Sequence, residues 1–250
     1  MSIEGGPQQS AESPKVDRAY AQQVQSFFSH QAERMHQGGE FTDDDDTVAG
    51  SGGIRKGALW EKMVEDARRE IHLLSRDEHL EKVKFQDLAL PIGVVAQCVS
   101  DNFERSKDIE SDEAEAAKQD HDDSREILVA ALGKIFPVNS NRERALDNWS
   151  LVVKELERAE ILGSDFSGMS TPEAFKLKKE NPQEFLSKLE AVIENACWNI
   201  GIRGKMAHEF GYYDDPKYKS GSDEMRINIT SAMKPLYELL ILQDELKKKK

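Results

Sequence analysis

The longest helical pattern of apolar residues in this chain lies between residues 186 and 210, LSKLEAVIENACWNIGIRGKMAHEF. Its apolar positions recur every three or four residues, which places their side chains on one stripe of an α-helix. The stripe consists of Leu186, Leu189, Val192, Ile193, Ala196, Cys197, Ile200 and Gly201. The pattern predicts a helix that packs against the core and closes in the polar sequence after the stripe.

Similar spacing predicts further helices in the chain. They cover residues 58–74, 126–136, 138–163, 171–179 and 225–250. In the segment 138–163, Ser140 or Asn141 can cap the first turn through a side-chain oxygen, and Gly163 can end the helix. Its expected inner stripe is Ala145, Trp149, Val152, Val153, Leu156 and Ala159.

Prolines and hydroxyl residues mark where the later helices begin. Ser170 or Thr171 is expected to cap the helix over 171–179, with Pro172 in the first turn, where a missing N–H costs no hydrogen bond. Pro182 opens the helix that contains the 186–210 pattern. Pro235 is expected to kink the final helix, whose terminal lysines suit the negative end of the helix dipole.

Two segments leave the secondary structure open. Residues 88–103 are strongly apolar, and Pro91 favours the first turn of a helix, yet the β-branched residues there also suit a buried strand. Residues 104–126 are almost wholly polar, which fits either an exposed helix or a mobile loop. We interpret this polar segment as a boundary between two helical units.

The fold class predicted from these patterns is all-α, because no set of alternating strands and no repeat of fixed period occurs. Residues 1–53 are expected to form a flexible arm, with a short helix over 16–37, followed by an acidic linker with four consecutive aspartates. Residues 54–125 are expected to form an N-terminal helical unit. Residues 126–250 are expected to form a C-terminal helical bundle.

Charge is distributed unevenly along the 250 residues, which carry a formal net charge of −13. Residues 1–133 hold 15 Lys and Arg against 28 Asp and Glu, whereas residues 134–250 hold 19 of each class. This distribution argues against a chain that coats nucleic acid over its whole surface, but it allows a basic groove in the second half. Its candidate RNA-binding residues are Arg142, Arg144, Arg158, Lys176, Lys178, Lys179, Arg203 and Lys205.

The remaining composition bounds the compartment and the chemistry. Cys98 and Cys197 both lie in apolar runs without a neighbouring cysteine, so a disulfide framework is not expected. No signal-peptide pattern and no run of eighteen apolar residues occurs, which predicts a soluble cytoplasmic protein without membrane contact. Motifs for dinucleotides, P-loops, zinc proteases and serine hydrolases are absent, and we expect no cofactor and no metal.

One local pattern offers chemistry, at the end of the 186–210 helix. Arg203, Gly204, Lys205, Met206, Ala207 and His208 place an arginine before a histidine with four residues between them. This segment resembles the motif of the HEPN family of helical endoribonucleases and toxins, over roughly residues 126–246. It departs from the family in having Gly204 after the arginine, where a polar residue is common.

The resemblance implies metal-independent RNA cleavage by a dimer, in which His208 is a general acid or base and Arg203 stabilises charge on phosphorus. Imidazole titrates near neutral pH, and guanidinium forks onto phosphate oxygens, so both residue types suit the task. The alternative interpretation gives Arg203 a favourable interaction with the helix dipole and His208 a structural hydrogen bond.

Two further functions compete with a nuclease. The layout of an aromatic arm, an acidic linker and a helical core is typical of self-assembling subunits, including helical nucleocapsid and filament coat proteins. In that interpretation Phe27 and Phe28 dock on a neighbouring subunit, and the basic residues of the second half bind RNA. A soluble helical adaptor that binds no nucleic acid suits the acidic first half.

Overall fold

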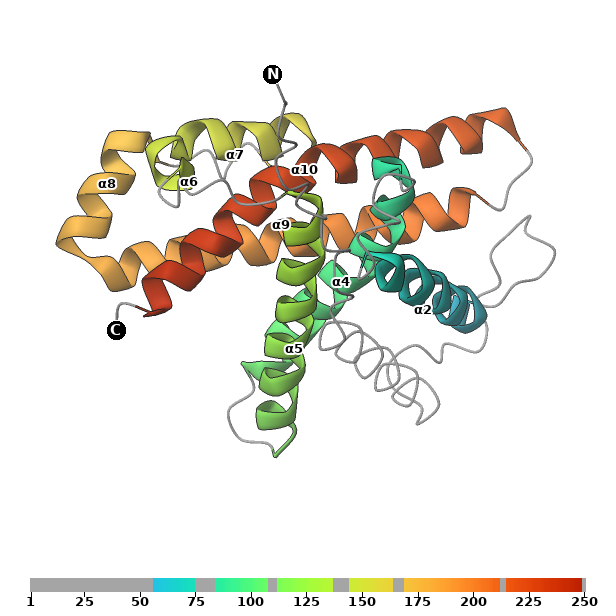
Figure 1. Ribbon diagram of the computed structural model, residues 1–250, viewed down its shortest axis with the longest axis horizontal. Coiled ribbons are helices and arrows are strands. Elements are labelled where there is room, and N and C mark those ends of the chain that lie inside the picture. The colour runs from blue at the N-terminus through green and yellow to red at the C-terminus, as the bar shows by residue number, and fades with distance from the viewer. Residues whose placement is uncertain are drawn as a thin grey trace, which may run out of the picture.

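The computed structural model describes residues 56–74, 84–107, 112–136, 144–163, 169–211 and 215–248. Within these ranges the chain forms eight α-helices and one 3-10 helix, and it has no strand (Figure 1). The all-α prediction is therefore confirmed. The predicted arm and linker over residues 1–53, including the short helix over 16–37, lie outside the described residues.

Helix α4 (Ala89–Ser106) runs through the centre of the molecule. All of its residues from 91 to 100 are buried, and it packs against α9 (Pro182–Phe210) and α5 (Asp112–Ile135). The apolar run that allowed either a helix or a strand is thus a helix. Pro91 lies in its first turn, where the ring removes no backbone hydrogen bond.

Helix α9 buries the whole stripe predicted from its sequence. It crosses α4 where both helices carry glycine: a Cβ atom added to Gly204 would lie 3.0 Å from the Cα atom of Gly93. One turn earlier, a Cβ atom on Gly201 would lie 2.9 Å from the Cα atom of Gln97. These glycines let the two backbones approach closely, because no side chain separates them.

Helix α2 (Lys56–Leu73) lies against α4 and reaches α9. Val64, Ala67 and Ile71 are buried, whereas Glu65 and Arg68 on the opposite side are exposed. This is the amphipathic helix that the sequence predicts, and the structure confirms it. The 3-10 helix η1 (Phe85–Leu88) leads directly into α4.

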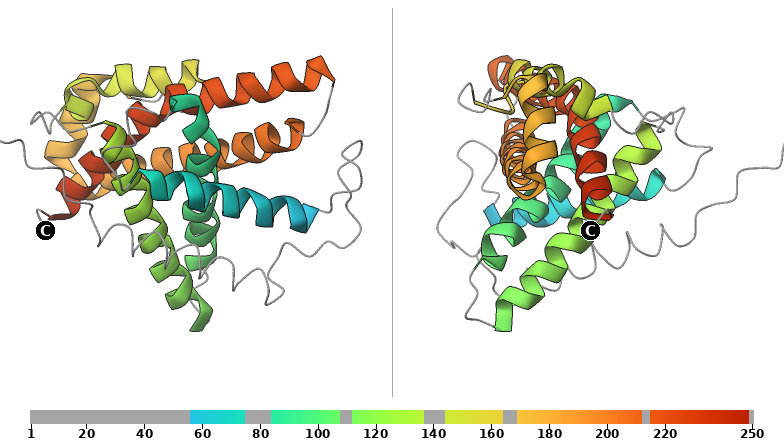
Figure 2. Two further views of the ribbon diagram at one scale, coloured as in Figure 1. Left: turned by 45° about the vertical axis from the view of Figure 1, so that its right-hand side comes forward. Right: turned by 90° about the vertical axis from the view of Figure 1, so that its left-hand side faces the viewer.

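The polar segment after α4 is largely helical. Helix α5 begins at Asp112, and its buried side in this region is made of Ala117, Asp120, His121 and Ser124. Small and polar side chains therefore make the packing face, which is why no apolar stripe marks it in the sequence. In both views of Figure 2 the beginning of α5 extends away from the layer that α9 and α10 form.

The domain boundary expected at residues 125/126 falls inside α5, which continues without a break to Ile135. Arg125 itself joins this helix to α10 (Pro216–Lys248). Its Nη2 atom lies 2.5 Å from Asp244 Oδ1 and donates to the carbonyl oxygen of Leu240 at 3.1 Å. Buried side chains from α2 to α10 belong to one hydrophobic cluster, so both expected units share a core.

The segment expected as one helix over 138–163 is two helices, α6 (Arg144–Asp147) and α7 (Trp149–Arg158). They are separated at Asn148, which has non-helical dihedral angles of φ −115° and ψ 26°. The expected caps Ser140 and Asn141 lie outside the described residues. The predicted inner stripe is nevertheless buried in full, since the break preserves the direction of that face.

Glu160, rather than Gly163, takes the left-handed conformation that ends α7, with a φ of 57°. The amide of Ile161 donates to the carbonyl oxygen of Leu156 at 2.9 Å, and the amide of Glu160 donates to the carbonyl oxygen of Glu157 at 2.9 Å. This pair of bonds is a Schellman motif, and the buried side chains of Ile161 and Leu156 belong to the core around it.

Helix α8 (Thr171–Glu180) starts as its sequence predicts. The Ser170 hydroxyl accepts a hydrogen bond from the Glu173 amide, and the Glu173 carboxylate accepts one from the Ser170 amide at 2.7 Å. This capping box satisfies two backbone donors at the helix start. The amide of Thr171 donates to the Ser150 hydroxyl at 2.9 Å, which fixes α8 to the beginning of α7.

Helix α10 begins at Pro216, about two turns earlier than the sequence pattern predicts. Its first turns carry few apolar residues and lie beside the end of α9, where the Ser222 hydroxyl donates to the carbonyl of Ala207 at 2.6 Å. Figure 1 shows α10 bending near its middle, and Pro235 lies inside the helix. A proline removes one helical hydrogen bond and accounts for the bend.

Candidate functional site

His208 lies in the last turn of α9 and is 7% exposed. Its Nε2 atom is 3.6 Å from Oδ2 of Asp66 on α2, so α2 covers the imidazole. The histidine that offers acid–base chemistry is therefore held in a protein-lined site beside a carboxylate.

Arg203 lies on another side of the same helix. Its side chain is 18% exposed, and Nη2 is 3.9 Å from Oε2 of Glu160, the residue that ends α7. Its Nε atom is buried without a hydrogen-bond partner. On a helix, positions five residues apart differ by about 140°, which agrees with contacts on two different elements. One chain thus directs Arg203 and His208 toward separate carboxylates.

The glycine that distinguishes this motif from the HEPN pattern has a packing role. Gly204 sits at the crossing of α9 and α4, where a larger residue would meet the backbone of Gly93. The position is thus buried between two helices and presents no side chain to a ligand.

The predicted RNA-binding residues fall on two distant parts of the molecule. Lys176 and Lys179 are exposed on α8, and Lys178 is half-buried there. Arg203 and Lys205 are half-buried near the end of α9. The exposed Arg158 at the end of α7 belongs with them, because Arg203 Nη2 lies 3.9 Å from Glu160, two residues after Arg158. Arg142 and the side chain of Arg144 lie outside the described residues.

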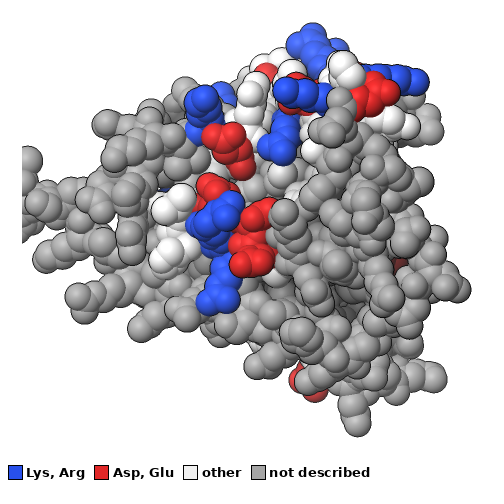
Figure 3. All heavy atoms as spheres, turned by 90° about the vertical axis from the view of Figure 1, so that its right-hand side faces the viewer, with Lys and Arg blue, Asp and Glu red and all other residues white. Residues whose placement is uncertain are grey.

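The distance along α9 separates these two groups. Helix α8 ends next to the start of α9 at Pro182, whereas Arg203 lies 21 residues further along. A helix rises 1.5 Å per residue, so the separation is about 30 Å. Among the described residues on the face at the end of α9, basic and acidic side chains are interspersed (Figure 3). One chain does not assemble the predicted residues into a single groove.

The outer face of α8 combines cations with an aromatic ring. Phe175 is 42% exposed, and Lys176 and Lys179 are exposed within about 100° of it around the helix. Ala174 is buried and holds the opposite face against the core. The sequence indicated the lysines but not Phe175, because an apolar residue in a short amphipathic helix is first assigned to its inner face.

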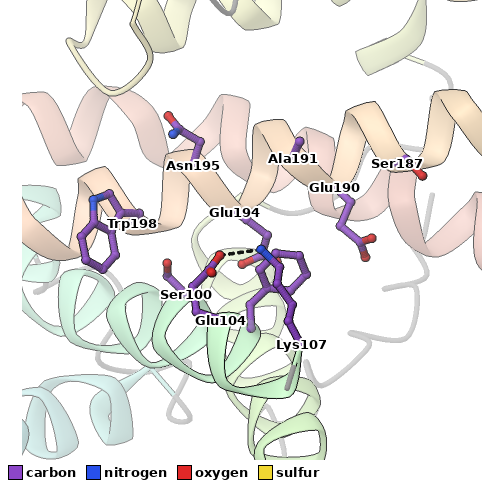
Figure 4. Close-up of a pocket in the computed structure, with 10 residues that line it drawn as sticks. Ser100, Glu104, Lys107, Ser187, Glu190, Ala191, Glu194, Asn195 and Trp198 are labelled. Carbon is purple, nitrogen blue, oxygen red and sulfur yellow. Dashed lines mark hydrogen bonds and ion pairs between the residues drawn. The ribbon is translucent and has the colours of Figure 1, made fainter. Parts of the chain in front are cut away.

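A groove that the sequence did not indicate lies between the end of α4 and the middle of α9 (Figure 4). Its volume is about 470 Å³. The α4 side carries Phe103, Glu104 and Lys107, and the α9 side includes Glu194 and Trp198. Trp198 is 44% exposed at one end. A tryptophan on the polar stripe of α9, opposite its apolar stripe, was the only signal in the sequence.

A buried acid–base pair underlies this groove. His121 Nε2 lies 3.1 Å from Glu194 Oε1, and His121 Nδ1 lies 3.2 Å from Asp122 Oδ1. Burial alone lowers the pKa of His121, but the hydrogen bonds and charges of Glu194 and Asp122 together raise it above its ordinary value. Burial also raises the pKa of Glu194, against the opposing effect of His121.

Comparison with protein-family models, curated proteins and solved structures gave no match. Among the helices that the structure describes, none is long and apolar enough to cross a membrane. The features that bear on function are the outer face of α8, the α4/α9 groove and the placement of Arg203 and His208.

Proposed function

We propose that this chain is a non-catalytic subunit that binds RNA and assembles with copies of itself. The observation that carries the proposal is the outer face of α8, where exposed Phe175 lies beside exposed Lys176 and Lys179. The capping box and the hydrogen bond to Ser150 hold this helix firmly on the molecule. Figure 1 places α8 at one end of the body.

These side chains fit single-stranded RNA by two separate interactions. Lysine ammonium groups displace counterions from phosphates, which gives affinity that depends on salt and not on sequence. A phenylalanine ring stacks on any base, because every base has a π-face. With two exposed lysines and one exposed ring, the α8 face of each copy binds a few nucleotides, so stable coverage of RNA requires many copies side by side.

The placement of the motif residues supports a structural role over a catalytic one. A catalytic histidine and arginine must reach the same phosphate, but His208 faces Asp66 on α2 and Arg203 faces Glu160 after α7. Both contacts join α9 to a neighbouring element, since Asp66 belongs to α2 and Glu160 follows α7. In this interpretation the end of α9 is a junction that fixes α2 and α7 on the core.

The test is the salt dependence of binding to a labelled single-stranded RNA. Replacing Lys176 and Lys179 by glutamate is expected to weaken binding at least tenfold and to lower the slope of log affinity against log salt by about 1.4, since each phosphate contact contributes about 0.7. The matched control is Lys84→Glu, an exposed lysine before η1, which should bind as the unmodified chain does. A flat salt response, or equal losses in both variants, would remove α8 as the RNA surface.

Endonuclease activity is the second candidate, and the contact between His208 and Asp66 favours it. A carboxylate beside an imidazole fixes the orientation of the ring, as a general acid or base requires. Since α2 covers His208, cleavage would require α2 to move and a second copy to supply Arg203. Incubating the protein with RNA in EDTA tests this candidate: cleavage that disappears in His208→Ala would establish it and displace the non-catalytic proposal.

A further inference from the structure

The α4/α9 groove offers an aromatic wall at each side. Trp198 of α9 is 44% exposed, an unusual state for so large a ring on a core helix. Across the groove, the ring centroids of Phe103 and His121 are 5.7 Å apart, and Lys107 Nζ lies 4.3 Å from the centroid of the Phe103 ring. Figure 4 shows Trp198 at one end, with Glu194 directed toward the end of α4. The groove can therefore receive aromatic side chains.

Carboxylates line the groove, and one of their oxygen atoms lacks a hydrogen-bond partner. Lys107 Nζ lies 2.6 Å from Glu104, Lys247 Nζ lies 3.6 Å from Glu190, and His121 Nε2 lies 3.1 Å from Glu194. Glu194 is only 7% exposed, and while its Oε1 atom contacts His121, its Oε2 atom has no hydrogen-bond partner. A buried carboxylate oxygen left unsatisfied costs stability, which a donor from a ligand would recover. The complementary ligand is an aromatic segment that also carries hydrogen-bond donors.

We propose that this groove binds the N-terminal arm of a second copy of the chain, with Phe27 and Phe28 packed against Trp198. The inference rests on the proposed function, because it names the receptor for the arm in assembly. In residues 16–37, VDRAYAQQVQSFFSHQAERMHQ, Phe27 and Phe28 lie between Arg18 and Arg34, and Asp17 and Glu33 are the acidic residues. This segment supplies the aromatic rings and the donors that the groove requires.

The length of the chain before α2 allows the arm to reach a neighbouring molecule. Phe28 and Lys56 are 28 residues apart, a length that spans up to about 90 Å when extended. Each copy carries one arm and one groove, so exchange between copies is heterologous and can continue into a ring or an open filament. That geometry matches a subunit that covers a long RNA.

Crosslinking between two variants of the full chain tests the contact directly. One variant carries Phe28→Cys, and the other carries Ala191→Cys, an exposed position in the groove. The two variants are purified separately, mixed and treated with a short thiol-to-thiol reagent. The native Cys98 and Cys197 are buried, so they leave little background. The expected product is a crosslinked pair of unlike chains, reduced at least fivefold when the second variant also carries Trp198→Ala.

The control acceptor is Leu151→Cys, because Leu151 is a comparably exposed apolar residue, but it lies on α7. The proposal is overturned if position 151 crosslinks as strongly as position 191, or if position 191 does not crosslink at all. A chain that carries both Phe28→Cys and Ala191→Cys supplies a second measurement. If it yields only internally crosslinked monomer, the arm binds its own groove, and exchange between copies is wrong.

Light scattering separates failure of this inference from failure of the proposed function. If the assembly formed by Phe27→Ala/Phe28→Ala has the same mass as that of the unmodified chain, the arm plays no part in assembly. Both the assembly role of the arm and its binding to the groove are then wrong. If that variant dissociates while Trp198→Ala assembles normally, the arm docks elsewhere, and only the groove is wrong. Loss of assembly in both variants, together with the crosslink at position 191, is the result that we expect.

Discussion

At the scale of single residues, glycines set the distance between α4 and α9. The Cα atom of Gly93 lies 3.0 Å from where a Cβ of Gly204 would be, and Gly201 faces the backbone of Gln97 just as closely. Gly201 also faces the Gln97 side chain, but the Cα atoms that obstruct both positions cannot rotate away as a flexible side chain would. The close packing of α4 and α9 thus depends on Gly93, Gly201 and Gly204.

We predict that Gly201→Ala and Gly204→Ala each lower the free energy of unfolding by about 1–3 kcal/mol, the usual cost of overpacking a core. The measurement is urea unfolding followed by circular dichroism. Gly163→Ala is the matched control, since a Cβ there would meet no atom within 4 Å, and it should change stability little. Equal stability in all three variants would contradict the close approach of the helices.

A second prediction concerns the left-handed residue that ends α7. Glu160 has a φ of 57°, a conformation that costs residues with a Cβ about 1 kcal/mol relative to glycine. Glu160→Gly should therefore be about 1 kcal/mol more stable than Glu160→Ala in chemical unfolding. Both variants lose the contact with Arg203, so their difference isolates the backbone. A more stable alanine variant would show that Glu160 is not left-handed in solution.

At the scale of elements, the pair of His121 and Glu194 joins α5 to α9 inside the protein. The raised pKa of His121 means that the folded chain binds more protons than the unfolded chain above its ordinary value of 6.5. Its stabilising effect is complete below that pH and is lost as the pH rises through the folded-state pKa. The raised pKa of Glu194 acts in the same direction above 4.5. Stability from this pair should fall as the pH rises.

Replacing Glu194 by glutamine should reverse the direction of the pKa shift of His121. Without the carboxylate, burial is the dominant influence on the imidazole, and its pKa in the folded chain should fall below the ordinary value. Measured by urea unfolding from about pH 5.5 to about pH 8.5, the variant should gain stability with rising pH relative to the unmodified chain. An unchanged pH profile would mean that the two side chains do not interact in solution.

Helix α5 shows how far the sequence pattern reaches at this scale. Helices α2, α8 and α9 could be predicted from apolar spacing, caps and prolines, because their buried faces consist of apolar residues. The buried face at the beginning of α5 is made of Ala117, Asp120, His121 and Ser124. Its polar side chains need particular partners, as the Ser124 hydroxyl donates to the carbonyl oxygen of Asp120. A pattern based on hydrophobicity does not register such a face.

At the scale of the whole molecule, RNA binding and assembly are assigned to separate surfaces. Lys176→Glu/Lys179→Glu on α8 should weaken RNA binding while the RNA-free protein keeps its mass in light scattering. Phe27→Ala/Phe28→Ala should lower that mass, with a much smaller effect on the binding of a short RNA that only one subunit covers. A variant that loses both properties together would show that the two surfaces are one.

The sequence by itself determined the all-α class, most helix positions and the exposed lysines of α8, since these depend on periodicity and on caps that lie within a few residues. Tertiary structure decided which side chains meet. The α4/α9 groove, the pair of His121 and Glu194 and the glycine crossing each join residues more than seventy positions apart. It also directed Arg203 and His208 to different partners, because their neighbours come from α7 and α2, and no spacing along α9 specifies what packs beside it.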